Sequence, residues 1–176
     1  MRGGWDWERH AGPRTIRHRP ACVKAAVLGL LAALALAGCA SDAALVPRDA
    51  VTSVSTTDAG PAATMISAYR VAHGLSPVTV DPRLNRAAEH QARAVAAAGR
   101  LGHGDFGGRM NDYGVGGFAA ENLTAGSPTV DGAIARWKAS PGHNSNLLMP
   151  QARSIGLARA DAKGGYGRYW ALVLGQ

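Results

Sequence analysis

The sequence is poor in cysteine, and both of its cysteines lie near the N-terminus. Cys22 and Cys39 are the only two among 176 residues. If Cys22 is removed with a leader and Cys39 carries a lipid, the mature domain has no thiol left for a disulfide. A cysteine nucleophile is then excluded. The folded domain must be stable through packing alone.

Aromatic residues are also few, at 6% of the chain, and the 47% hydrophobic content depends heavily on alanine. We therefore expect a core of closely packed helices rather than one filled by large side chains. Two catalytic signatures are missing from the sequence: the Gly-x-Ser-x-Gly nucleophile elbow and the His-Glu-x-x-His zinc-binding helix. Their absence argues against the common serine hydrolase and zinc protease arrangements.

The chain is strongly basic, with a pI near 10.1, but its charge is unevenly distributed. Met1 to Cys39 contains 6 Lys and Arg against 2 Asp and Glu, a balance of +4. The remaining residues, Ala40 to Gln176, contain 13 and 10, a balance of +3. No cluster of basic residues interleaved with aromatics follows the leader. We therefore predict no nucleic-acid partner.

The longest apolar run is too short for a comfortable membrane span. It covers the 14 residues from Ala25 to Gly38 and follows Lys24, whereas a spanning helix needs about 20 residues. Such a run is typical of a signal peptide. It ends in Leu36-Ala37-Gly38-Cys39, which resembles the bacterial lipobox. An ordinary secretory peptide that happens to contain a cysteine is the alternative. We predict a signal peptide over 1–38 and a diacylglyceryl group on Cys39.

The flanks of this leader suggest two further hypotheses. Residues 1–22 make an unusual start, and translation beginning at Val23 would leave a normal short basic region. Ala40 after the lipidated cysteine, rather than Asp, favours the outer membrane if the host has two membranes. Residues 39–61 are rich in Ala, Ser, Thr, Asp and Pro, which predicts a flexible tether behind the lipid anchor. The folded domain is then expected over 62–176.

Hydrophobic periodicity predicts alternating helices and strands in this domain. Helices are expected before Gly74, from Asp81-Pro82 to Gly99, around 109–113, and from Ser127-Pro128 through Trp137. Short extended segments are expected at 76–80, 118–123, 154–160 and 166–174. The last of these is apolar on both faces, so both faces must be covered. The pattern predicts an α+β domain, a three-layer α-β-α sandwich with a small antiparallel sheet.

One stretch, Ala133 to Leu148, combines a helix with a chemically useful break. The helix that carries Trp137 is expected to stop at Ser140-Pro141-Gly142, because proline removes an amide donor and glycine tolerates helix-ending conformations. His143 would then lie on the turn, held by rigid elements on either side. A histidine in such a place can face a cleft.

The order of several short motifs resembles the CAP superfamily, also called the SCP or cysteine-rich secretory protein family. The resemblance covers about Thr64 to Gln176 and is closest to short bacterial members. It implies an α-β-α sandwich, in agreement with the two-faced last strand. The matching motifs are Leu-x-His103-x-Asp-Phe, Glu121-Asn122-Leu123, Trp137 ahead of Ser-Pro-Gly-His143, Asn146-Leu147-Leu148, Ile155-Gly156-Leu157 and Tyr169-Trp170.

The resemblance implies a cleft with two histidines and two acids. His103 takes the place of the first histidine, Glu121 of the first glutamate, and His143 of the second histidine. The second acid is absent, because this chain has Lys138-Ala139-Ser140 where the family motif would place it. We interpret this as a feature of the bacterial branch. Any mechanism that needs two carboxylates is put in doubt.

Each site residue also has a simpler interpretation. His103, in a glycine-rich loop, could be a surface or capping residue. Glu121 has apolar neighbours, so we expect it to be buried with a partner such as a backbone amide or Arg109. Asp105 could form a turn or contact a ligand. Asn122 is also a candidate ligand-binding residue, although both Asn122 and Asn146 are expected to tie loops to the backbone.

The chemistry of this set is limited but definite. The imidazoles of His103 and His143, with Glu121, could hold a divalent ion such as zinc with modest affinity, or exchange protons near neutral pH. Our leading hypothesis is an exported lipoprotein whose CAP domain binds a metal or an unidentified small-molecule, lipid or protein ligand. The alternatives are a metal-assisted hydrolase of envelope or extracellular substrates and a structural envelope protein with a vestigial cleft. Binding is favoured over catalysis.

Overall fold

The computed structural model describes residues 50–176. They belong to one compact unit, Asp42–Gln176. Two hydrophobic clusters lie inside this unit, so it has a complete core of its own and is expected to fold as a domain. The predicted signal peptide, Cys39 and the first part of the tether lie outside the described residues and stay predictions. Within 50–176, no helix is both long and apolar enough to cross a bilayer.

The centre of the domain is a five-stranded sheet. Its main path runs β1, β4, β5, β3, and every pair along this path is antiparallel. The short β2 adds to β4 in parallel, through Thr79 and Val80. The predicted antiparallel sheet is therefore confirmed for the four longer strands. The strand bounds are β1 Val51–Ser55, β2 Thr79–Val80, β3 Ala119–Ala125, β4 Ser154–Ala162 and β5 Arg168–Gly175.

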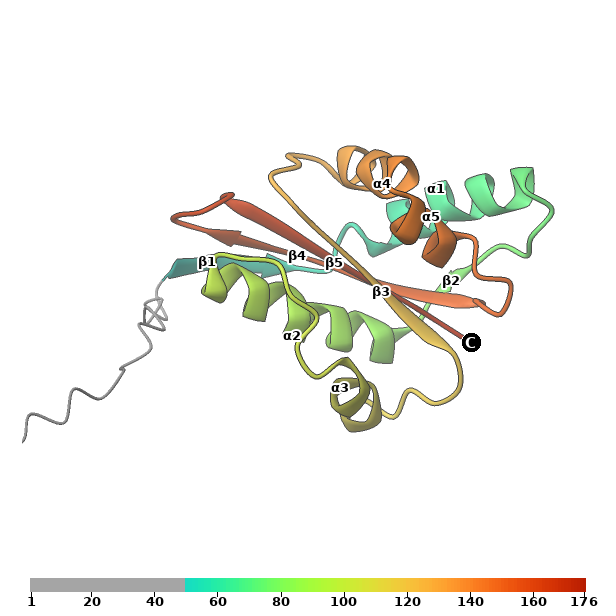
Figure 1. The fold of residues 1–176 in the computed structure, drawn as a ribbon, viewed down its shortest axis with the longest axis horizontal. Helices are drawn as coiled ribbons and strands as arrows, with labels where there is room; N and C mark the ends of the chain where they lie inside the picture. The colour runs from blue at the N-terminus through green and yellow to red at the C-terminus, as the bar shows by residue number, and fades with distance from the viewer. Residues whose placement is uncertain (1–49) are drawn as a thin grey trace, which may run out of the picture. The chain divides into compact units, whose positions relative to one another are not determined.

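Helices cover both faces of the sheet (Figure 1). One layer consists of α1, α4 and α5, and the other of α2 and α3. The predicted three-layer α-β-α architecture is thus confirmed. The helix bounds are α1 Ala59–Ala72, α2 Pro82–Ala98, α3 Phe106–Asp112, α4 Val130–Ala139 and α5 Pro141–Leu147.

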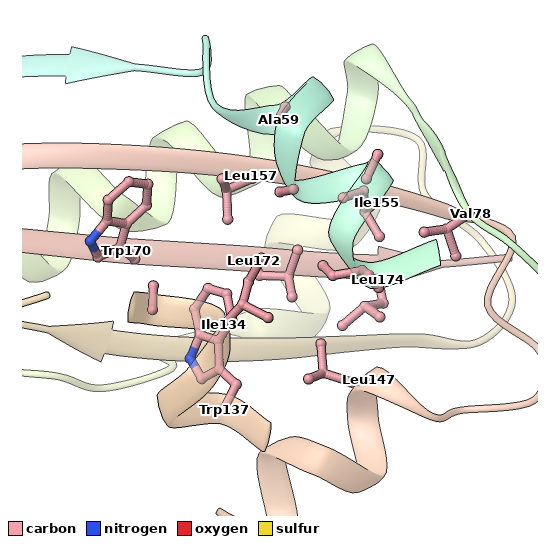
Figure 2. Packing of buried hydrophobic residues seen from close by; sticks show 14 of the residues in the cluster. Ala59, Val78, Ile134, Trp137, Leu147, Ile155, Leu157, Trp170, Leu172 and Leu174 are labelled. Carbon is pink, nitrogen blue, oxygen red and sulfur yellow. The ribbon is translucent and has the colours of Figure 1, made fainter. Parts of the chain in front are cut away.

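The strand β5 explains why two helical layers are needed. Its alternate residues enter the two hydrophobic clusters. Trp170, Leu172 and Leu174 lie in one cluster with Trp137 of α4 and Ile66 of α1. Figure 2 shows the three strand residues and Trp137. Tyr169 and the other odd-numbered positions pack with α2. Both tryptophans are fully buried and belong to the core.

The helix α2 approaches the sheet very closely at Gly156 of β4. A Cβ atom on Gly156 would lie 2.0 Å from the carbonyl carbon of Leu84 and 2.2 Å from the amide nitrogen of Asn85. The Asn85 side chain also accepts a hydrogen bond from the Leu157 amide at 3.0 Å. Only glycine leaves room for this contact between helix and strand.

The tether prediction is wrong for about its second half, from Val51 to Pro61. We expected a flexible chain through Pro61, whereas β1 begins at Val51 and α1 at Ala59. The strand is stabilised by pairing with β4, and Val51 and Val54 pack against the α2 cluster. Pro61 is tolerated because the first amides of a helix need no intrahelical acceptor.

The N-terminus of α2 is as predicted, but that of α4 is not. Asp81 caps α2 by accepting a hydrogen bond from the Arg83 amide at 2.7 Å. For α4 we expected a cap at Ser127 with proline following, yet Thr129 is the N-cap and the helix begins at Val130. Ser127 is instead buried, where its carbonyl accepts a hydrogen bond from Trp170 Nε1 at 2.9 Å. Tertiary packing thus overrides the local capping signal.

The predicted helix break before His143 is confirmed at Ser140, but the predicted turn is wrong. The helix α4 ends at Ala139, and Pro141 and Gly142 open the short helix α5 instead of forming a loop. Proline is favoured at the first helical position, where its missing amide costs nothing. His143 therefore lies in the first turn of α5.

Candidate functional site

The predicted site residues gather around two neighbouring positions of the edge strand β3. Glu121 and Asn122 are both buried, with 6% and 0% exposure. Successive residues of a strand point to opposite faces of a sheet. Glu121 therefore faces the α2 and α3 layer, and Asn122 faces the α4 and α5 layer. Each binds the segment that carries one of the two histidines.

The carboxylate of Glu121 is held by the imidazole of His103 and the guanidinium of Arg109. Its Oε1 accepts a hydrogen bond from His103 Nδ1 at 2.8 Å, and its Oε2 accepts one from Arg109 Nη2 at 2.5 Å. Arg109 is itself buried and also donates to the His103 carbonyl at 3.2 Å. The expected partner of the buried glutamate is thus Arg109. It fixes both the carboxylate and the loop that carries His103.

This hydrogen bond fixes the tautomer of His103. A carboxylate can only accept, so Nδ1 must carry the hydrogen and donate it to Glu121. In the neutral ring, Nε2 is then left with its lone pair. The His103 side chain is 57% exposed, so Nε2 can be reached from solvent. The pair therefore presents an oriented imidazole base at the edge of the sheet.

On the other face, Asn122 ties α5 to the same point of β3. Its Nδ2 donates to the His143 carbonyl at 2.9 Å. Its Oδ1 accepts a hydrogen bond from Asn146 Nδ2 at 2.9 Å, and Asn146 also donates to the Glu121 carbonyl at 3.4 Å. Both asparagines therefore have the predicted structural role.

The imidazole of His143 is half-buried and electrically coupled to His103. Burial lowers the pKa of His143 below its ordinary value of 6.5, and the nearby charge of His103 lowers that pKa further. His143 therefore stays neutral at pH 7 and is available as a ligand or as a hydrogen-bonding group.

Arg70 of α1 stabilises the end of α5, a role that the sequence analysis did not identify. Its guanidinium is fully buried and donates to four backbone carbonyls, at distances from 2.8 to 3.0 Å. Burial lowers the pKa of Arg70, and Arg153 lowers that pKa further. Its neighbour Tyr69 donates to Asn144 Oδ1 at 2.9 Å. Since α1 and β3 both hold α5, His143 sits on a rigid support. The four acceptors of Arg70 are the carbonyls of Ser76, Leu147, Met149 and Ala152.

The structure also shows where Asp105 lies and which side chain lies at the place of the missing second acid. Asp105 is the N-cap of α3 and accepts a hydrogen bond from the Gly108 amide at 2.9 Å. It therefore forms a turn, which was one of the two roles considered for it. Contact between Asp105 and a ligand stays a prediction. At the place of the missing second acid, Lys138 lies with its Nζ 4.2 Å from the centre of the Tyr69 ring.

The geometry fits a zinc site only partly. Both oxygens of Glu121 are engaged, one by a buried guanidinium that would repel a cation. Across residues 50–176, no group of three or more His, Cys, Asp or Glu side chains is arranged to hold a metal ion. Glu121 is better described as the group that orients His103 behind any bound ion. The zinc prediction therefore depends on two imidazoles, His103 and His143, with water completing the coordination.

Three hollows of the described surface lie away from the two histidines. One of about 340 Å³ is formed around Gly116 and Gln176, beside the start of α2. Two others, of about 190 and 260 Å³, adjoin each other along α2 and share Gln91 and Gly104. None of these three is lined by His103, Glu121 or His143.

Comparison with known proteins identifies the family. The profile of the cysteine-rich secretory protein (CAP) family matches residues 63–174. The chain belongs to this family. A search of curated proteins gave no match. The CAP domain of this chain thus includes α1 to β5, together with all the site residues described above.

Solved structures of bacterial proteins share the fold. An outer surface protein from Borrelia burgdorferi matches with a TM-score of 0.58 and 20% identity, over 64% of this chain and 87% of that one. An extracellular SCP-domain protein from Bacillus anthracis has a TM-score of 0.58 and 22% identity, over 66% and 39%. A cysteine-rich secretory protein from Staphylococcus aureus has a TM-score of 0.54 and 19% identity, over 65% and 36%. The chain thus spans well under half of the last two proteins, and all three likenesses concern the fold alone.

Proposed function

We propose that this chain is an exported, lipid-anchored CAP-domain protein that binds a ligand between His103 and His143. One observation carries the proposal. Adjacent residues of β3, Glu121 and Asn122, hold the His103 side chain and the His143 backbone from opposite faces of the sheet. Such a convergence of two histidine-bearing segments on one point is the arrangement expected of a binding site on a rigid scaffold.

Export is supported by the leader and by the related structures. The lipobox-like Leu36-Ala37-Gly38-Cys39 supports lipidation of Cys39, and the membrane is then a partner through that anchor. The related structures are described as an outer surface protein, an extracellular protein and a cysteine-rich secretory protein. These observations support a placement in the bacterial cell envelope, and Ala40 after the cysteine supports the outer membrane where a host has two.

The electrostatics of the site define the kind of group it would bind. Glu121 is neutralised by Arg109, so it contributes no free negative charge. His103 offers Nε2, and His143 is a neutral imidazole because its pKa is lowered. The ligand is therefore a group that hydrogen-bonds to imidazole, or a metal ion held weakly by two imidazoles and water.

A second candidate function, metal-assisted hydrolysis, is favoured by the pairing of Glu121 with His103. A carboxylate that orients an imidazole through Nδ1 is also the arrangement of a general base. His103 would accept a proton at Nε2, and Glu121 would stabilise the imidazolium that forms. The structure nevertheless offers only one carboxylate at this point, so we rank binding ahead of hydrolysis.

Zinc titration of the unit Asp42–Gln176 by calorimetry tests the proposal. We expect weak binding that is lost in His143→Ala and in His103→Ala, because two imidazoles supply all the protein ligands. Binding should weaken as the pH falls below 6.5, since a ligating imidazole must be neutral and the pKa of His143 is lowered from that value. His90→Ala is the matched control, because His90 is exposed on α2 and bonds to Tyr113 at 3.2 Å. This control should bind zinc as the unchanged chain does.

The outcomes separate the hypotheses. A zinc heat that persists in the His103→Ala, His143→Ala double variant, or none in the unchanged chain, contradicts convergence of the two imidazoles. Zinc-stimulated hydrolysis of a peptide or envelope substrate that His143→Ala abolishes would favour the enzyme. Absence of both activities in a correctly folded domain would leave two hypotheses, a cleft for an organic ligand and a structural envelope protein without a functional cleft.

A further inference from the structure

The hollow of about 260 Å³ between α2 and α3 gathers acidic groups that have no basic partner. Residues 50–176 contain eight Asp and Glu side chains, and five of them form ion pairs with arginines of the same range. The other three are Asp105, Asp112 and Asp131. Two of these three, Asp105 and Asp112, line this one hollow. Two unpaired carboxylates that share a hollow attract the same cationic ligand.

The negative charge is local to this hollow. Arg109 also lines it, but the charge of Arg109 is compensated by Glu121, whose carboxylate it binds. The arginines on and directly after α2 balance the acids of this side overall, and they lie outside the lining of the hollow. They are Arg83, Arg86, Arg93 and Arg100, of which Arg83 pairs with Asp81 and Arg93 with Glu89. The hollow itself therefore carries two negative charges when His90, which also lines it, is neutral.

A buried acceptor, Gln91 Oε1, belongs to the same lining. Gln91 is 3% exposed and lines both this hollow and the one that adjoins it. Its Nε2 donates to the Gly102 carbonyl at 2.5 Å, which fixes the orientation of the amide and leaves Oε1 to accept. Within residues 50–176 no group donates to this oxygen, and it is not one of the fully enclosed atoms without a partner. Gln91 Oε1 is therefore open to the hollow and lacks a donor.

We propose that this hollow binds a linear aliphatic amine with at least two ammonium groups. The two carboxylates and Gln91 Oε1 only accept hydrogen bonds, whereas an ammonium group only donates them. Asp105 is the N-cap of α3 and Asp112 is its last residue. Seven residues are about two helical turns, so these two aspartates lie on one side of α3, about 10 Å apart along its axis. This spacing suits a chain that carries an ammonium group beside each carboxylate.

An amine fits the lining better than a metal ion does. No group of three or more metal-binding side chains occurs in the described part of the chain, so a metal would have too few protein ligands. Asp105 Oδ1 already accepts a hydrogen bond from the Gly108 amide at 2.9 Å. Ala94 of α2 lies in the lining between the polar groups and offers a methyl surface to the methylene groups of an amine. The inference does not depend on ligand binding by His103 and His143 or on the lipid anchor.

Titration of the unit Asp42–Gln176 with spermidine, a linear triamine, tests the proposal when it is followed by amide NMR. We expect shifts of the Gln91, Gly104 and Gly108 amides at low salt, with a Kd of about 1–10 mM, which is usual for a ligand of this size. Salt of about 0.5 M should abolish them, because screening weakens such contacts. Butylamine, with one ammonium group, should bind at least about threefold more weakly, because it can pair with only one carboxylate.

Asp105→Asn with Asp112→Asn should weaken spermidine binding by about 4- to 25-fold, because an exposed ion pair contributes up to about fivefold. Asparagine caps a helix as well as aspartate does, so α3 keeps its start. The matched control is Asp58→Asn with Asp131→Asn. It removes the same charge beside α1 and on α4, in the other helical layer, and should weaken binding by less than about twofold.

Equal losses in the two double variants would overturn the proposal, since net charge alone would then explain binding. So would the absence of shifts at Gln91, or butylamine binding as tight as that of spermidine. His103→Ala should bind spermidine as the unchanged chain does. Loss of binding in this variant would also overturn the proposal, because the amine would then occupy the histidine site. Failure of the zinc titration leaves these expectations unchanged, so the two sites are tested separately.

Discussion

Gly156→Ala should destabilise the domain by about 3 kcal/mol or more. The added methyl group would overlap the Leu84 carbonyl carbon, 2.0 Å away, and the Leu84 oxygen, 2.3 Å away. These are backbone atoms in the first turn of α2, so no side-chain rotation relieves the overlap. Overpacking usually costs about 1–3 kcal/mol, and more where the backbone must move. Urea unfolding followed by circular dichroism measures the loss.

Gly175→Ala on β5 is the matched control for this change. Its added methyl group would also meet Leu84, but at 3.1 Å from Cδ1, the mobile end of a side chain. We therefore expect a loss of about 1 kcal/mol or less. Equal unfolding midpoints for the two variants would mean that α2 does not approach β4 as closely as described.

Trp170→Ala should cost about 3–5 kcal/mol, which is the usual range for removing a buried aromatic side chain. Trp170 is 1% exposed in the centre of β5 and packs with the α1 and α4 layer. The loss is a large share of the about 5–15 kcal/mol that stabilises an ordinary domain. Thermal and denaturant unfolding should both show it.

Trp170→Phe separates packing from hydrogen bonding at the same position. This variant keeps an aromatic ring but loses the bond from Nε1 to the Ser127 carbonyl. We expect a cost of about 1–3 kcal/mol, because a buried carbonyl is left without its donor. A Trp170→Ala domain as stable as the Trp170→Phe domain would show that β5 is not the central strand.

The architecture could be predicted because local signals and the buried pattern agreed. The two-faced apolar pattern of Tyr169 and Trp170 required helices on both sides of the sheet, and both helical layers are present. The cap and proline at Asp81-Pro82 gave the start of α2 correctly. At Ser127 the same signal failed, because the carbonyl of this residue is needed by Trp170. A local capping signal therefore predicts the start of a helix correctly only where no buried tertiary contact uses the same residue.

The strand β1 and the residue Arg70 could not be predicted, for different physical reasons. The segment around Val51 has too few large residues to reveal a strand, and its pairing depends on β4, more than 100 residues later. Arg70 resembles an exposed helical arginine, yet four distant carbonyls surround it. Contacts between residues so far apart in the sequence cannot be predicted from the local pattern of hydrophobic and polar residues.

The site was predicted in part. Burial of Glu121 followed from its apolar neighbours and is confirmed, and of the two partners considered for it, the structure shows Arg109. The sequence did not predict that both oxygens of Glu121 are engaged by protein groups, because the orientation of Glu121 relative to His103 depends on the tertiary fold. The glutamate that we considered as a ligand is occupied by two partners.

Nitrogen-15 NMR of the histidine rings tests most directly the claim that Glu121 orients His103 beside a neutral His143. In the neutral state, His103 should carry its hydrogen on Nδ1 and leave Nε2 unprotonated. His143 should titrate below 6.5, and its pKa should rise in His103→Gln, because the neighbouring positive charge is removed. A His103 ring protonated on Nε2, or a His143 titration that His103→Gln leaves unchanged, would contradict the account.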